Sequence, residues 1–153
     1  MTNRHKFFVG AAAALLLGAA TPAYAANTFT AASGNDWNTV ANWSAGHVPA
    51  DGEDVVVNGN VLLTNATAAL ASYTLNSGKT HTFDGWGTVL SAAVVNVTGT
   101  LTHTNNQATN AVGGVWYPNA RVWIVCSNLT VNTGGKIDVN YKGYQVGLWF
   151  KPG

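Results

Sequence analysis

The chain has 153 residues, of which 47% are hydrophobic and only 8% are charged, and its formal net charge is +1. This length predicts one domain, and the lack of a basic cluster argues against nucleic acid or an anionic membrane surface as a partner. So few charges cannot solvate amphipathic helices, whereas Thr, Asn, Ser and Gly, which favour strands and turns, fill the polar positions. We therefore expect an all-β protein.

Residues 1–25 have the pattern of a cleaved secretory signal peptide. Arg4 and Lys6 precede the apolar run 7–20, and small residues at Ala23 and Ala25 complete a cleavage signal. The apolar run is shorter than the roughly 20 residues that a membrane-spanning helix needs, so we expect no membrane span in the mature chain. The sequence thus predicts a secreted or cell-surface protein, exported by a bacterium.

Residues 26–57 are the least repetitive segment, and we interpret them as an N-terminal cap followed by a first strand. Trp37 and Trp43 are large enough to lie over the end of a stack of strands and shield its apolar side chains. Pro49 has no backbone N–H to donate, so it suits the turn into the first strand. These residues form the predicted structural cap.

Three carboxylates, Asp51, Glu53 and Asp54, lie at the start of that first strand. We interpret them as turn and edge residues, with Asp54 part of the cap, since charge at a strand edge discourages further pairing. The alternative is a Ca²⁺ site, because carboxylate oxygens are the ligands that Ca²⁺ prefers. The segment lacks the D-x-[DN]-x-[DN]-G loop of Ca²⁺-binding helix pairs, so we predict no metal and no cofactor here.

Residues 58–153 repeat a single pattern: an alternating apolar run, a Gly-centred turn and a second alternating run. The turn glycines Gly59, Gly78 and Gly99 recur at intervals of about 20 residues, the period of a β-solenoid, and Gly134 follows after a longer interval. Antiparallel hairpins in a sandwich would place such turns about 8 to 12 residues apart. The period therefore favours a right-handed parallel β-helix over a sandwich.

Two THT triplets place His81 and His103 nearly one period apart, so the two imidazoles are candidates to lie one above the other on adjacent coils. Stacked imidazoles bind Zn²⁺ or Cu²⁺ when further ligands are present, but the only other histidine of the mature chain is His47, in the predicted cap. We expect partly buried, hydrogen-bonded histidines in preference to a metal site.

The segment WNTVANWSAGHVPADGEDVVV (residues 37–57) and the later stretch CSNLTVNTGGKIDVNYKGY (126–144) carry a family resemblance. They resemble bacterial cell-surface proteins of the autotransporter passenger type, built on right-handed parallel β-helices. The opening is also similar to the extracellular β-rich domain named for its eight glycines. The resemblance implies a surface β-helix used for adhesion or as a scaffold. It also implies further coils, so we expect the β-helix of residues 58–153 to be truncated at its C-terminus.

Catalysis has little support in the sequence, and we predict no enzyme. Polysaccharide-processing β-helices need several carboxylates and a basic residue in one groove, but outside the cap the mature chain has only Asp84 and Asp138 as acids and Arg121 as its sole arginine. Carbohydrate binding without catalysis is the stronger alternative, because aromatic residues are more numerous than a slender core can hide. The candidate glycan-binding residues are Trp116, Tyr117 and Trp123.

The sequence therefore predicts a non-catalytic, secreted or surface-displayed structural or adhesion domain. The alternative is a carbohydrate-binding or polysaccharide-processing β-helix. Expected partners are host or environmental glycans or surface proteins. The last strand pattern, 129–144, lacks a polar cap after it, so we also expect self-association through an open C-terminal edge or continuation into further coils.

Overall fold

The computed structural model describes residues 25–32, 34–106, 111–112 and 115–143. Within them the chain is all-β, as predicted, and its only helical segment is the short 3-10 helix η1 (Val40–Asn42). The strands are β1 (Asn27–Phe29), β2 (Asp54–Val57), β3 (Val61–Leu63), β4 (Leu70–Leu75), β5 (Thr80–Phe83), β6 (Leu90–Val97), β7 (Thr100–His103), β8 (Ala111–Val112), β9 (Val115–Trp116), β10 (Ile124–Val125), β11 (Asn128–Val131) and β12 (Lys136–Ile137).

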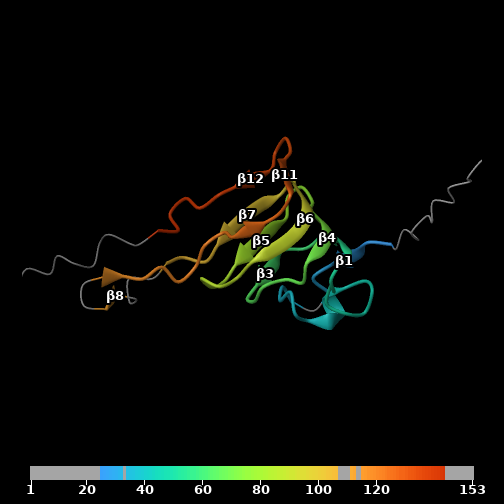
Figure 1. Cartoon of the computed structure of the whole chain (residues 1–153), viewed down its shortest axis with the longest axis horizontal. Coiled ribbons are helices and arrows are strands. Elements are labelled where there is room, and N and C mark those ends of the chain that lie inside the picture. The colour runs from blue at the N-terminus through green and yellow to red at the C-terminus, as the bar shows by residue number, and fades with distance from the viewer. Residues whose placement is uncertain (1–24, 33, 107–110, 113–114, 144–153) are drawn as a thin grey trace, which may run out of the picture.

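The strands form two parallel sheets (Figure 1). The six-stranded sheet has the order β1-β2-β4-β6-β10, with β11 also paired to β6, and the four-stranded sheet has the order β12-β7-β5-β3. Neither sheet is closed. Strands β8 and β9 pair antiparallel in a separate hairpin that lies to one side of the two sheets (Figure 1).

Four strands of the six-stranded sheet are each followed, after a turn, by a strand of the four-stranded sheet. Thus β2 leads to β3, β4 to β5, β6 to β7, and β11 to β12. Successive units lie side by side: Asp54 pairs with Ser72, 18 residues later. The side chain of Asn60 likewise accepts a hydrogen bond from the backbone N–H of Thr80, 20 residues later. This spacing accounts for the period read from the turn glycines.

The interval before the last unit is longer because other structure is inserted after β7. The β8–β9 hairpin and strand β10 occur there, and β10 joins the edge of β6. The turns on either side of this insertion still meet, since the Asn132 amide donates to the Thr98 hydroxyl across 34 residues of sequence. The insertion therefore contributes β10 to the six-stranded sheet and leaves the contact between the turns on either side of it in place.

The core lies between the two sheets and is built mainly by alternation of side chains, which β4 and β6 each interrupt once. From the six-stranded sheet, the buried residues include Val55, Val57, Tyr73, Leu75, Val95 and Val97; from the four-stranded sheet, they include Val61, Leu63, His81, Phe83, Leu101 and His103. Successive residues of a strand point to opposite faces, so every second side chain enters the core. Each large apolar side chain buried in this way contributes about 1.5–3 kcal/mol.

Glycine is required where one turn is packed directly against the next. A Cβ atom on Gly99 would lie 2.3 Å from the carbonyl oxygen of Lys79, and one on Gly135 would lie 2.2 Å from that of Val97. Both distances are far below any real Cβ contact, and both partners are backbone atoms. Side chains at these positions would push successive units apart.

The two ends of the core differ. At the β1 end it is closed by aromatic residues, whereas at the β11–β12 end the side chains of Leu129, Val131 and Ile137 are 44–46% exposed. These three residues are in register with the buried residues Val95, Val97 and Leu101. They therefore continue the rows of the core without being covered by another strand in the part of the chain that is described.

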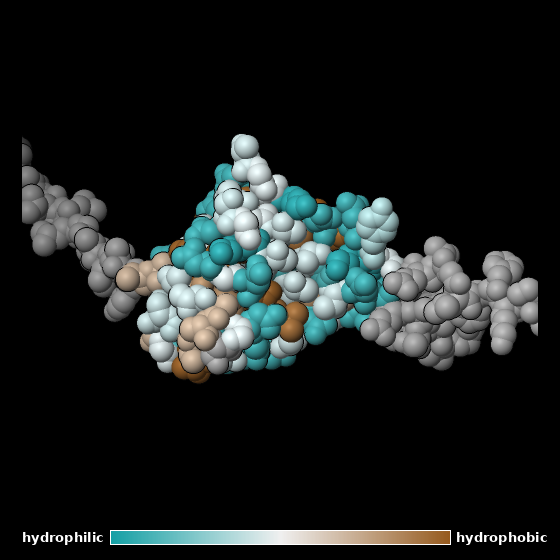
Figure 2. Space-filling view, turned by 180° about the vertical axis from the view of Figure 1, so that it is seen from behind, coloured by the Kyte–Doolittle hydropathy of each residue, from teal (hydrophilic) through white to brown (hydrophobic). Residues whose placement is uncertain are grey.

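Polar and intermediate residues cover most of the face seen in Figure 2, and apolar residues form small separate patches on it. Among the described residues, no helix has the length and apolar character required to cross a membrane. The expected signal peptide falls almost entirely in residues 1–24, outside the described residues, as do Tyr144 and everything that follows it.

Candidate functional site

The predicted cap residues Trp37 and Trp43 are buried together beside β1. Their rings meet edge to face at 4.6 Å, and Trp43 makes a similar contact with Phe29 at 5.1 Å. The indole N–H of Trp43 donates a hydrogen bond to the Trp37 carbonyl oxygen at 2.7 Å, so its polar atom is satisfied within the cluster. The structure thus places both tryptophans in the core at the β1 end.

Pro49 is buried and lies two residues before the turn into β2. The interpretation of Asp54 as an edge residue is wrong, because β2 lies between β1 and β4 and is not an edge strand. Asp54 instead accepts a hydrogen bond from the Ser72 hydroxyl of its neighbour β4. Its carboxylate therefore links two strands that are already paired.

The three carboxylates of this region do not converge on one point. Asp51 accepts from the backbone N–H of Ala69 at 2.7 Å, and Glu53 contacts His47 at 2.6 Å and the Asn27 amide at 3.2 Å. The described residues contain no group of three or more His, Cys, Asp or Glu side chains arranged to hold a metal ion. Each of the three acids instead bonds to its own nearby partner.

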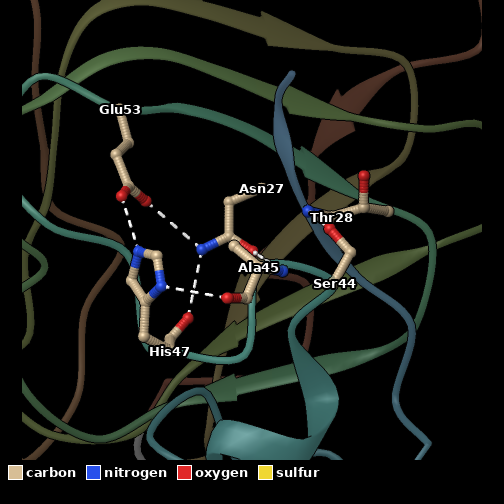
Figure 3. A network of polar contacts seen from close by, with 6 residues as sticks. All are labelled: Asn27, Thr28, Ser44, Ala45, His47 and Glu53. Atoms are coloured by element: carbon tan, nitrogen blue, oxygen red, sulfur yellow. Dashed lines mark hydrogen bonds and ion pairs between the residues drawn. The ribbon is translucent and has the colours of Figure 1, made fainter. Parts of the chain in front are cut away.

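Glu53 and His47 form the centre of a polar network that joins the segment before β2 to β1 (Figure 3). The Asn27 amide donates both to Glu53 and to the His47 carbonyl, and the Asn27 side-chain oxygen accepts from the Ala45 N–H. The hydrogen bond to Glu53 raises the pKa of His47, and the same bond lowers the pKa of Glu53. The pH range in which both groups are charged is therefore wider than it would be if they were not paired.

The expected stacking of His81 over His103 is wrong. In the register of β5 and β7, His81 lies beside Leu101 and His103 lies beside Phe83. His81 is fully buried, stacks on the ring of Phe83 at 4.6 Å, and shares a 2.6 Å hydrogen bond with the Tyr73 hydroxyl. Burial lowers the pKa of His81 to about 3, so this imidazole is neutral at physiological pH.

His103 is also buried, and its Nδ1 contacts the carbonyl oxygen of Thr104 at 2.6 Å. Both histidines are therefore hydrogen-bonded core residues, but they are bonded to different partners and not to each other.

Exposed aromatic side chains lie on the segments that flank β6 and β10. Trp86, in the loop between β5 and β6, is 46% exposed, and Trp123, which precedes β10, is 39% exposed. Tyr117 is 54% exposed. Trp116 belongs to β9, but its side chain lies outside what the structure describes.

Arg121 connects the two exposed tryptophans. Its guanidinium carbon lies 4.2 Å from the ring centroid of Trp86 and 3.8 Å from that of Trp123, and its Nε–H donates to the Trp86 carbonyl oxygen at 2.9 Å. Cation–π contacts of this kind contribute about 0.5–1 kcal/mol each at exposed sites. We call Trp86, Arg121 and Trp123 the arginine–tryptophan site.

The backbone on both sides of Arg121 is fixed by hydrogen bonds. The side-chain oxygen of the buried Asn106 accepts from the N–H groups of Asn119 and Ala120 at 2.7 and 2.9 Å. On the other side, the Trp123 carbonyl accepts from the N–H of Leu90 at the start of β6 at 3.0 Å. Arg121 is thus presented from an anchored segment and not from a free loop.

The sequence predicts Trp123 as a binding residue but does not predict that Arg121 and Trp86 belong to the same site. The order Arg-Val-Trp indicates that Arg121 and Trp123 lie on one face, since residues two apart in an extended segment share a face. Trp86 gave no such signal, because it lies 35 residues before Arg121 in the sequence. Only the parallel pairing of β6 with β10 brings the two segments together.

Comparison of the chain with protein-family models, curated proteins and solved structures found no match.

Proposed function

We propose that this chain is a secreted or surface-displayed right-handed parallel β-helix domain that serves as a structural or adhesion module without catalytic activity. The observation that carries the proposal is the repeated order of the strands. The units β2–β3, β4–β5 and β6–β7 each add one strand to each sheet, always in parallel. Stacked units of this kind form extended, rigid surfaces suited to display. Right-handedness is favoured because parallel crossover connections are almost always right-handed.

The use of the acidic side chains supports a role without catalysis. All six Asp and Glu side chains accept hydrogen bonds from nearby structural groups; they are Asp36, Asp51, Glu53, Asp54, Asp84 and Asp138. Acid–base chemistry on a polysaccharide needs carboxylates that converge on the substrate. In this chain Asp51, Glu53, Asp54 and Asp84 instead link neighbouring turns or strands, whereas Asp36 and Asp138 accept from residues two positions away.

Export is tested by expressing the full chain in a bacterium and separating the cell fractions. We expect the protein outside the cytoplasm, with Ala26 as its N-terminal residue. A matched variant, Leu16→Arg, interrupts the apolar run of the leader and should leave the protein in the cytoplasm. Recovery of the unaltered chain in the cytoplasm with residues 1–25 still attached would contradict the proposed location.

The second candidate function is carbohydrate binding, and the arginine–tryptophan site is the observation that favours it. The half-exposed indoles of Trp86 and Trp123 flank the Arg121 guanidinium, and exposed aromatic surface of this kind usually marks a binding site. A glycan array probed with residues 26–153 tests this function. Binding that disappears in Trp123→Ala but persists in Tyr141→Ala, at an aromatic residue that is 98% exposed, would support it. Equal loss in both variants would contradict it.

A further inference from the structure

The positive charge of Arg121 is not neutralised by the described part of the protein. The ion pairs found there are His47–Glu53 and Lys136–Asp138, and neither involves Arg121. Every Asp and Glu side chain is also engaged elsewhere by the hydrogen bonds described above. An arginine held in place without a carboxylate partner leaves its charge available to an external anion.

The hydrogen-bonding groups of Arg121 are likewise largely unused. Among the described residues, its one acceptor is the Trp86 carbonyl, which takes the Nε–H. The two terminal nitrogens keep their N–H groups for a ligand. A guanidinium presents these donors as a planar fork whose geometry matches the two oxygens of a carboxylate.

The site is also preorganised. The contacts with Trp86 and Trp123 hold the guanidinium, and the hydrogen bonds of Asn106 and Leu90 hold the backbone that carries it. A ligand would therefore pay little of the ordering entropy that weakens binding to flexible side chains. This distinguishes Arg121 from a solvated surface lysine such as Lys79, for which no side-chain partner is found in the described residues.

The surroundings of Arg121 select the class of ligand. Both indoles remain partly exposed, at 46% and 39%, so an apolar face can be packed against them while an anionic group meets the guanidinium. A uronic acid offers both features, because its pyranose ring has a C–H face and its carboxylate is attached to the same ring. An acidic peptide offers the carboxylate without the flat face.

We propose that the arginine–tryptophan site binds uronic-acid residues of acidic polysaccharides, with Arg121 pairing with the sugar carboxylate and Trp86 and Trp123 packing against the sugar ring. This inference rests on the carbohydrate-binding function proposed above and specifies its ligand class.

The test is calorimetric titration of residues 26–153 with oligogalacturonate, with its methyl ester, and with oligoglutamate of similar length. We expect oligogalacturonate to bind more tightly than oligoglutamate, which lacks the flat ring face, and at least about tenfold more tightly than its methyl ester, because the ester loses a charge-assisted hydrogen bond. Arg121→Gln should abolish this preference, and Arg121→Lys, which keeps the charge but not the fork, should recover only part of it. Lys79→Ala, which removes one positive charge elsewhere, is the matched control and should bind within about twofold of the parent chain.

Each contrary result has a distinct meaning. Equal binding of oligogalacturonate and its methyl ester, lost in Trp123→Ala, would overturn the acidic specificity but leave carbohydrate binding in place. Equal binding of oligoglutamate would overturn the assignment to sugars. Absence of binding by all three probes would overturn this inference, and the glycan array would then decide separately whether carbohydrate binding stands. A far-ultraviolet circular dichroism spectrum of each variant confirms that the fold is intact.

Discussion

Replacement of Gly99 by alanine should destabilise the protein strongly, because Gly99 lies where the β6–β7 turn is packed on the β4–β5 turn. The new Cβ would lie 2.3 Å from the Lys79 carbonyl oxygen, 2.6 Å from that of Asn76 and 2.9 Å from Cγ of Leu75. Two of these three atoms belong to the backbone, so no change of rotamer relieves the contact. The turns must separate, and the change acts on the parallel stacking itself.

The loss of stability in Gly99→Ala can be estimated from the hydrogen bonds that would break if the two turns moved apart. The N–H groups of Thr98 and Thr100 donate across this contact, to the carbonyls of Leu75 at 2.9 Å and of Lys79 at 2.8 Å. Overpacking costs about 1–3 kcal/mol, and a buried hydrogen bond left unmade costs a similar amount. We expect a loss of about 3 kcal/mol or more, a large part of the stability of about 5–15 kcal/mol typical of a domain.

Urea unfolding followed by tryptophan fluorescence measures this loss, with Gly87→Ala as the matched control. A Cβ on Gly87 meets no atom within 4 Å, so that variant should stay within about 0.5 kcal/mol of the parent. A difference between the two variants of less than about 1 kcal/mol would refute the close approach of the turns, because the overpacking and the broken hydrogen bonds would then be absent.

Three further outcomes are expected. Trp43→Ala should lower the free energy of unfolding by about 3 kcal/mol, since it removes a buried aromatic ring; a loss under half of that would mean that the cap role predicted for Trp43 is wrong. Because the pKa of His47 is raised and that of Glu53 is lowered, their pairing stabilises the fold most between the ordinary values of 4.5 and 6.5. This contribution is lost as the pH falls through the lowered pKa of Glu53 or rises through the raised pKa of His47. The difference in melting temperature between the parent and Glu53→Gln should therefore be largest between pH 4.5 and 6.5. A difference that does not depend on pH would contradict the pairing. Residues 26–153 should self-associate at tens of micromolar through the half-exposed row that includes Leu129 and Val131, whereas sedimentation of a clean monomer, unchanged in Leu129→Lys, would contradict an adhesive edge.

The class of fold could be predicted from the sequence because its signals are local and repeated. Alternation of apolar residues fixes which side chains enter the core, and turn glycines about 20 residues apart favour stacked parallel units over hairpins. The register between units could not be predicted. The turn between Leu75 and Thr80 is longer than the turn between Val97 and Thr100, so strands of the two sheets are offset differently, and His81 meets Leu101 instead of His103.

The environment of Asp54 could not be predicted for a different reason. Strand β1 has 3 residues, Asn27–Phe29, too few to show a recognisable alternation, so the sequence gives no sign that another strand lies beside β2. The arginine–tryptophan site was missed in part because Trp86 reaches Arg121 only through the pairing of β10 with β6. Long-range pairing of short strands leaves no periodic mark on the sequence, and it is what assembles this site.

Disulfide trapping between neighbouring units tests the parallel stack most directly. Thr82 and Thr102 are register partners on β5 and β7, and both are only partly buried. Adjacent strands lie about 4.8 Å apart, within the range of Cα separations that a disulfide spans. In a Cys126→Ser background, Thr82→Cys with Thr102→Cys should oxidise readily to an intramolecular disulfide. The pair Thr82→Cys with Thr100→Cys, two residues out of register on the same face, should do so much more slowly. Efficient trapping of Thr82→Cys with Thr74→Cys on β4, and not with Thr102→Cys, would mean that consecutive strands form antiparallel hairpins, and the stacked parallel fold would be contradicted.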